Sequence, residues 1–111
     1  MSMQISAVPF MTTAWESVPE EAHPGETGTA WWRTVEVGNI RVRIVRYSPG
    51  YLADHWCNRG HVVFCLEGEL TTELKDGTLH RLTPGMSYQV ANDAAAHRSR
   101  TVPGAMLFIV D

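Results

Sequence analysis

His55, Cys57 and His61 lie close together in the sequence, and their side chains are of the types that bind transition metals. We interpret residues 58–60 as a three-residue hairpin loop, which places Cys57 opposite His61. Side chains alternate along a strand, so His55 and Cys57 share a face, and the cross-strand pair brings His61 to that same face. The spacing therefore predicts an open metal site with room for water or a substrate.

Two other interpretations of these residues stay open at this point. The three side chains could simply fill a core, because cysteine is often buried as a small hydrophobic residue. A disulfide between Cys57 and Cys65 is disfavoured, since the same register separates them by about 13 Å, well beyond the roughly 7 Å limit for a bridge. We expect Cys65 to be a buried thiol.

Strands and turns must position these residues. Residues 40–44 alternate apolar and charged side chains, which predicts a half-buried strand. Asp76-Gly77 between two short runs predicts a hairpin with a type I′ turn, and the apolar run 105–110 predicts a fully buried closing strand. Turn signals recur at roughly 8–12-residue spacing, so we predict an all-β chain, folded as a sandwich or a small barrel.

The first thirty residues differ from the rest of the chain. They contain prolines, glycines and an acidic stretch, with little periodicity. We predict an irregular N-terminal arm over residues 1–30, with a short turn of helix near residues 17–22, and a β-barrel domain over residues 31–111.

The composition argues against several classes of protein. A formal net charge of −3 provides no basic surface for nucleic acid or an anionic membrane. No apolar run approaches the roughly 18 residues of a spanning helix, and the N-terminus does not resemble a signal peptide. We therefore expect a cytoplasmic protein.

The spacing also resembles that of the cupin family. The first cupin motif matches Gly50, His55, Cys57, His61 and Gly68, with one residue fewer after the first glycine. Cys57 stands where the family has its second histidine, and His61 stands where it has glutamate.

The second cupin motif is matched less closely. Pro84-Gly85 is followed by a strand pattern, a loop and His97, but a proline and a glycine are absent and the histidine comes one residue late. Thr101 takes the place of the usual asparagine. Asp54-His55-Trp56-Cys57 is similar to the cupin subgroup named for a DHCW motif, for which no reaction is established.

The resemblance implies a single-domain jelly-roll β-barrel whose interior holds one divalent metal on His55, Cys57, His61 and His97. Thiolate in place of imidazole, and imidazole in place of carboxylate, make this set softer; they favour zinc, with nickel, iron or cobalt as alternatives. Thiolate ligation requires a reducing compartment. Cupins frequently pair through N-terminal strands, and Trp31-Trp32 offers aromatic surface for this, so a homodimer is expected.

Four further residues are candidates for the cavity or for contacts with the ligands. Asp54 is a candidate to accept a hydrogen bond from a ligand or from an arginine such as Arg41 or Arg43. Tyr88 and Gln89 lie on a strand near the second motif, and the register decides which one lines the cavity. His23 lies in a Pro/Gly-rich segment, where it is either a lid residue or an exposed loop histidine.

Three hypotheses about function follow. The first is a metal-dependent enzyme acting on a small polar molecule inside the barrel. The second is a non-catalytic module that senses a small ligand or a metal. The third is a structural metal site without chemistry, which a closed shell of four protein ligands would indicate.

Overall fold

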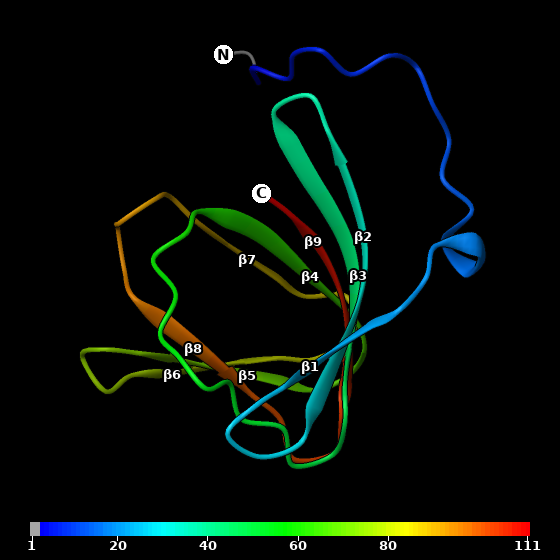
Figure 1. The fold of residues 1–111 in the computed structure, drawn as a ribbon. Helices are drawn as coiled ribbons and strands as arrows, with labels where there is room; N and C mark the ends of the chain where they lie inside the picture. The colour runs from blue at the N-terminus through cyan, green and yellow to red at the C-terminus, as the bar shows by residue number, and fades with distance from the viewer. Residues whose placement is uncertain (1–2) are drawn as a thin grey trace.

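A computed structural model describes residues 3–111, which form two antiparallel β-sheets (Figure 1). The larger sheet has the strand order β1-β2-β3-β9-β4-β7, and the smaller one has the order β6-β5-β8. The elements are η1 (Trp15–Ser17), β1 (Glu21–Pro24), β2 (Thr29–Val37), β3 (Ile40–Tyr47), β4 (His61–Gly68), β5 (Leu70–Leu74), β6 (Leu79–Leu82), β7 (Ser87–Val90), β8 (His97–Arg100) and β9 (Ala105–Val110). The all-β prediction is confirmed.

The core lies on the inner face of the larger sheet, where β9 is inserted between β3 and β4. Val45 of β3 pairs with Leu107, and Val63 of β4 pairs with Ile109; all four side chains are buried. Complete burial of an aliphatic side chain contributes about 1.5–3 kcal/mol. Residues 105–110 were expected to be buried throughout, but alternate residues of β9 are only half-buried because they face the outer side of the sheet.

The hairpin predicted at Asp76-Gly77 is confirmed, because β5 and β6 pair on either side of it. The turn is not type I′, since Gly77 has a φ of +89° but Asp76 does not share the positive φ. Asp76 instead accepts a hydrogen bond from the backbone N–H of Thr78, at 2.9 Å. The aspartate stabilises the turn through its side chain and not through a left-handed backbone.

The helical turn in the N-terminal arm lies earlier than predicted. It spans Trp15–Ser17, and the expected turn over residues 17–22 is wrong. Val18 has an extended backbone, and it precedes Pro19. A residue before proline is driven out of the helical region, and proline has no N–H to continue a helix, so the turn ends there.

Residues 21–24 and 29–30 take part in the larger sheet. β1 and the first residues of β2 fall inside the segment predicted as arm, while Met1 and Ser2 lie outside the described residues. The arm before β1 passes along the side of β2 and β3 that faces away from the smaller sheet (Figure 1). Arg33 of β2 fastens it, because its Nη1 donates hydrogen bonds to the carbonyl oxygens of Trp15, Glu16 and Val18.

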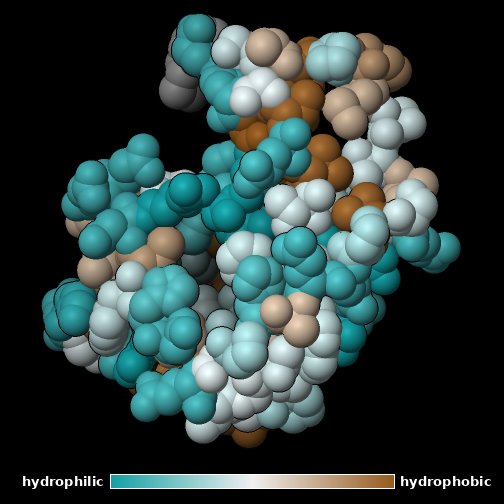
Figure 2. All heavy atoms as spheres, viewed as in Figure 1, coloured by the Kyte–Doolittle hydropathy of each residue, from teal (hydrophilic) through white to brown (hydrophobic). Residues whose placement is uncertain are grey.

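The surface view shows apolar residues gathered beneath the arm and strongly hydrophilic residues around the C-terminal end of β9 (Figure 2). Among residues 3–111, no helix has the length and apolar composition to span a membrane.

Candidate metal centre

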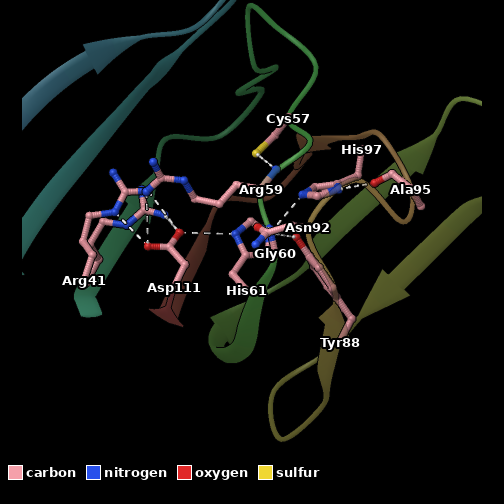
Figure 3. Close-up of polar contacts among 11 residues, drawn as sticks. Arg41, Cys57, Arg59, Gly60, His61, Tyr88, Asn92, Ala95, His97 and Asp111 are labelled. Atoms are coloured by element: carbon pink, nitrogen blue, oxygen red, sulfur yellow. Dashed lines mark hydrogen bonds and ion pairs between the residues drawn. The ribbon is translucent and has the colours of Figure 1, made fainter. Parts of the chain in front are cut away.

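The side chains of His61 and His97 meet between the two sheets, with their ring planes at 62° to each other. His61 is the first residue of β4 in the larger sheet, and His97 is the first residue of β8 in the smaller one. Their Nε2 atoms are 2.9 Å apart, and both side chains are more than nine-tenths buried (Figure 3). The strand pairing of two separate sheets therefore brings together two imidazoles that are far apart in the sequence.

The hydrogen bonds around this pair determine where the protons can lie. Nδ1 of His97 donates to the carbonyl oxygen of Ala95 at 2.8 Å, which leaves a lone pair on its Nε2. Nδ1 of His61 is 3.5 Å from Oδ2 of Asp111, and the hydroxyl of Tyr88 is 3.0 Å from Nε2 of His61. A proton on Nδ1 of His61, facing the carboxylate, leaves a lone pair on its Nε2 as well.

Each neutral form of His61 then leaves one contact unfavourable. With the proton on Nδ1, two Nε2 lone pairs face each other at 2.9 Å. With the proton on Nε2, the Nδ1 lone pair faces the carboxylate of Asp111. Burial lowers the pKa of His97, and the nearby His61 lowers it further, so His97 does not supply the missing charge. A cation at this pair would remove the conflict.

Cys57 reaches the same region from the loop before β4. Its backbone N–H and C=O pair with those of His97, at 2.8 and 3.0 Å. Its sulfur accepts a hydrogen bond from the backbone N–H of Arg59 at 3.4 Å.

His55 lies at the rim of the cavity. Its side chain is 75% exposed, and its Nδ1 is 2.6 Å from Oδ1 of Asp54. The predicted contact between Asp54 and a candidate ligand is therefore present. The alternative partners expected for Asp54, Arg41 and Arg43, bind Asp111 instead.

The hairpin proposed around residues 58–60 is wrong. Residues 51–60 form a loop with isolated bridges, and Cys57 pairs with His97 and not with His61. The reason is that β4 has no free edge: β7 pairs with it on one side and β9 on the other. Cys65 lies opposite Leu107, and it is a buried free thiol as expected.

The four predicted ligands nevertheless line one cavity of about 300 Å³. Among these four residues, the side chains of His61 and His97 are in direct contact with each other. Across residues 3–111, no three histidine, cysteine or acidic side chains lie close enough together to hold one metal ion.

The remaining candidates, Tyr88, Gln89 and His23, differ in whether they line this cavity. Tyr88 points into the cavity and contacts His61, whereas Gln89, the next residue, is exposed and does not line this cavity. His23 lies on β1 rather than in a loop, and its ring stacks on Trp32 with centroids 3.9 Å apart. Trp32 itself lines the cavity.

Sequence reasoning missed a charged cluster around Asp111. Arg41 binds this carboxylate with two hydrogen bonds, Arg43 adds one at 3.1 Å, and Arg59 lies 3.7 Å away (Figure 3). Burial alone would raise the pKa of Asp111, but the contacts with His61 and the arginines lower it well below the ordinary range. The carboxylate therefore stays ionised, and its Oδ2 lies 3.5 Å from Nδ1 of His61, a buried atom without a hydrogen-bond partner among the described residues.

One signal in the sequence pointed to this cluster. Strand alternation places Arg41 and Arg43 on the same face as Val45, and it places Asp111 on the same face as Leu107 and Ile109. The pattern fixes these shared faces, but which face is the interior depends on long-range packing.

A second cavity of about 550 Å³ lies on the other side of Tyr88 and His97, which line both spaces. Its walls come mainly from β6, β7 and neighbouring residues, including Leu79, Leu82 and Met86. This space is more apolar than the first because it lacks the arginine cluster.

No family model matches the chain, and a search of curated proteins finds no relative. Solved structures do match its fold. Ectoine synthase from P. lautus is similar with a TM-score of 0.73 at 19% identity, over 91% of this chain and 76% of that one. A sugar phosphate isomerase of the cupin superfamily from Silicibacter pomeroyi gives 0.66 at 18% identity, over 90% and 74%. A cupin-like protein from Thermotoga maritima gives 0.67 at 18%, over 77% and 69%.

These likenesses define the class of the protein: the chain has the cupin jelly-roll fold. At such identities they concern the fold alone, and they do not extend to the DHCW subgroup.

Proposed function

We propose that this chain binds one divalent transition metal at the His61–His97 pair. The observation that carries the proposal is the pair of facing buried Nε2 atoms, 2.9 Å apart, which offer two imidazole nitrogens to one cation. Metal–nitrogen bonds of about 2.1 Å put two neighbouring imidazole nitrogens roughly 3.0–3.4 Å apart, so the observed 2.9 Å requires only a small opening. Asp111 and the carbonyl of Ala95 support the two rings from behind, as partners of metal-bound histidines do.

Cys57 and His55 complete the proposed donor set. Cys57 is tied to His97 through the backbone, and its sulfur already accepts a hydrogen bond, which suits a thiolate. His55 lines the same cavity with its Nδ1 on Asp54, leaving Nε2 as its donor atom. One thiolate among imidazoles favours zinc, with nickel, iron or cobalt as alternatives.

We propose further that the cavity is the site of an enzyme acting on a small polar molecule. When bound, such a metal supplies Lewis-acid activation of an oxygen ligand or of water. Tyr88 presents its hydroxyl beside His61, and burial raises its pKa, so it retains its proton and donates a hydrogen bond. Two of the structurally similar proteins, ectoine synthase and the sugar phosphate isomerase, are named as enzymes.

A non-catalytic binding or sensing module is the second candidate, and one observation favours it. Asp111, the carboxylate lining the cavity, is held by arginines and its pKa is lowered, so it is a poor general base. A cavity whose one carboxylate side chain is held this firmly suits reversible binding.

Support for the predicted homodimer comes from a different surface than the expected one at Trp31 and Trp32. Trp32 faces the cavity and Trp31 packs under Arg46, so neither is a free aromatic surface. Val62, Phe64 and Leu66 instead form an exposed apolar row on the outer face of β4. We propose that a second copy covers this row, which sedimentation velocity tests directly by comparing the chain with Phe64→Ser.

Elemental analysis of protein purified without chelator tests the metal proposal. We expect close to one equivalent of metal in the wild type, and loss of most of it in His61→Ala and His97→Ala. His80→Ala is the matched control, because His80 is exposed on the β5–β6 hairpin. Cobalt substitution adds a spectroscopic readout: a thiolate-to-metal charge-transfer band that disappears in Cys57→Ser. Full metal content in both histidine variants would overturn the proposal.

A further inference from the structure

The cavity carries more positive charge than its one carboxylate can balance. Arg41, Arg43 and Arg59 all line it and all lie within 3.7 Å of Asp111. Arg98 also lines it, but its guanidinium is paired with Glu73 outside the cavity, at 3.1 Å. Among the side chains of the cavity, three guanidiniums therefore face one carboxylate.

Arg43 is the least compensated of the three. Its side chain is only 7% exposed, and its Nε is buried without a hydrogen-bond partner in the part of the chain that the structure describes. Its guanidinium carbon lies 4.4 Å from the ring centroid of Trp32. Burial lowers the pKa of Arg43, and the charge of Arg41 lowers it further, which is the direction expected when a buried cation lacks a full counter-anion.

Arg59 supplies a second guanidinium at the mouth of the same cavity. It lies in the loop before β4, and its side chain is 54% exposed. Its distance of 3.7 Å from Asp111 is that of a charge contact and not of a hydrogen bond. Its donors are therefore available to an incoming anion.

We infer that the natural ligand of this cavity is a small carboxylic acid, anchored by the unpartnered Nε of Arg43 and by the guanidinium of Arg59. A planar carboxylate matches an edge of a guanidinium held against an indole ring. This inference deepens the proposed function, since the ligand would lie in the cavity lined by the His61–His97 pair.

The dimensions of the cavity limit the size of the acid. At about 300 Å³ it lies at the lower end of the range for ligand pockets. Arg43 and Arg59 can each bind one carboxylate group, which suits a dicarboxylate better than a monocarboxylate. The cavity therefore fits short-chain acids with one or two carboxylates.

Calorimetric titration with malonate, succinate and glutarate tests the inference. We expect at least one of these acids to bind the wild type, and its neutral diamide not to bind. Affinity should fall about tenfold or more in Arg43→Gln and in Arg59→Gln, because each loses a charge-assisted hydrogen bond. Arg46→Gln is the matched control: Arg46 lies on the same strand as Arg43 but points outward, where it pairs with Glu20.

Arg43 is buried, so circular dichroism must first show that Arg43→Gln folds; if it does not, Arg59→Gln carries the test because its side chain is half-exposed. Failure of all three acids to bind overturns the inference. So does equal or tighter binding of inorganic phosphate, or unchanged affinity in Arg59→Gln.

Titrating both chelator-treated and metal-loaded protein separates this inference from the metal proposal. Arginine-dependent binding of the acid to protein that takes up no metal supports the anion site and refutes the metal centre. Metal uptake without binding of any acid supports the metal centre and refutes the anion site.

Discussion

The carboxylate of Asp111 accepts two parallel hydrogen bonds from the guanidinium of Arg41, at 2.8 and 3.0 Å. The backbones of the same two residues pair as well, with N–H to O distances of 2.6 and 2.9 Å. The backbone hydrogen bonds continue the β3–β9 pairing as far as Asp111, and the side-chain hydrogen bonds hold its carboxylate beside His61. Asp111 thus links the framework of the larger sheet to the candidate metal centre.

Asp111→Asn should destabilise the protein at neutral pH by about 3 kcal/mol, the scale for breaking a buried ion pair. The pKa of Asp111 is lowered in the folded state, so its ionised form adds stability above the unfolded pKa near 4. That contribution is lost as the pH falls through the lower folded pKa. Urea unfolding at pH 7 and pH 3 should therefore show a steeper loss for the wild type than for Asp111→Asn.

Asp93→Asn is the control for this comparison, because Asp93 is exposed and its positive φ suits asparagine. If the free energy of unfolding fell equally with pH in the wild type and in Asp111→Asn, the pH dependence could not be assigned to Asp111.

The two cysteines should react at very different rates. Cys57 is half-buried and lines the cavity, whereas Cys65 has no exposed surface. Burial raises the pKa of the Cys65 thiol, which reduces its thiolate fraction near pH 8. Iodoacetamide should label one cysteine in the native protein and two after unfolding in guanidinium, as measured by intact mass. Peptide mapping should place the native label on Cys57.

Zinc should slow the labelling of Cys57 if this thiol is a ligand. Cys57→Ser provides the control, since it should leave the native protein unlabelled. Native labelling of Cys65 at the rate of Cys57 would show that the core opens more readily than its packing indicates.

Gly68 should tolerate no side chain. A Cβ there would lie 2.0 Å from the carbonyl oxygen of Gly104, while a Cβ at Gly77 would meet nothing within 4 Å. Both glycines have a positive φ, so both alanine variants carry a similar backbone cost of about 1 kcal/mol. Gly68→Ala should lose about 2 kcal/mol more than Gly77→Ala in urea unfolding, because the backbone of the β4–β5 connection must move. Equal losses would mean that this contact relaxes freely.

Arg33→Met should release the N-terminal arm. The variant removes the donor to three carbonyl oxygens of η1 and its flank, at a cost of about 2 kcal/mol. Hydrogen exchange should accelerate at the amides of Ser17 and Val18, which pair within this turn. Arg100→Met, on an exposed position of β8, should leave those amides unchanged. Unchanged exchange in Arg33→Met would indicate that Trp15 packing on Phe108 holds the arm by itself.

Local sequence patterns predicted much of the fold. Alternation identified the strand at residues 40–44, and Asp76-Gly77 located a hairpin, because both features depend on residues that are neighbours in the chain. The position of β9 between β3 and β4 explains why other predictions were wrong. Residues 51–60 form isolated bridges to the edge strand β8 instead of pairing with β4, and no local pattern reveals that distant strands already occupy both edges of β4.

The site, like the fold, was predictable only in part, because long-range packing brings its residues together. Spacing and family resemblance selected His61 and His97, and the structure brings them into contact across the two sheets. The role of Asp111 in the cavity and the inward direction of Arg43 were not predicted. An alternating strand has two faces, and arginine is usually found on the exposed one. Only the charge balance inside the folded barrel makes a buried arginine understandable.

Tyr88 and His97 together form the partition between the polar cavity and the apolar one. A thin partition made of two side chains lets a single substitution merge the compartments, as Tyr88→Ala would, while the arginines and Asp111 stay in place. A single substitution would therefore open the site to longer ligands. Such a ligand would bind Arg43 through its carboxylate and place an apolar chain beside Leu82 and Met86.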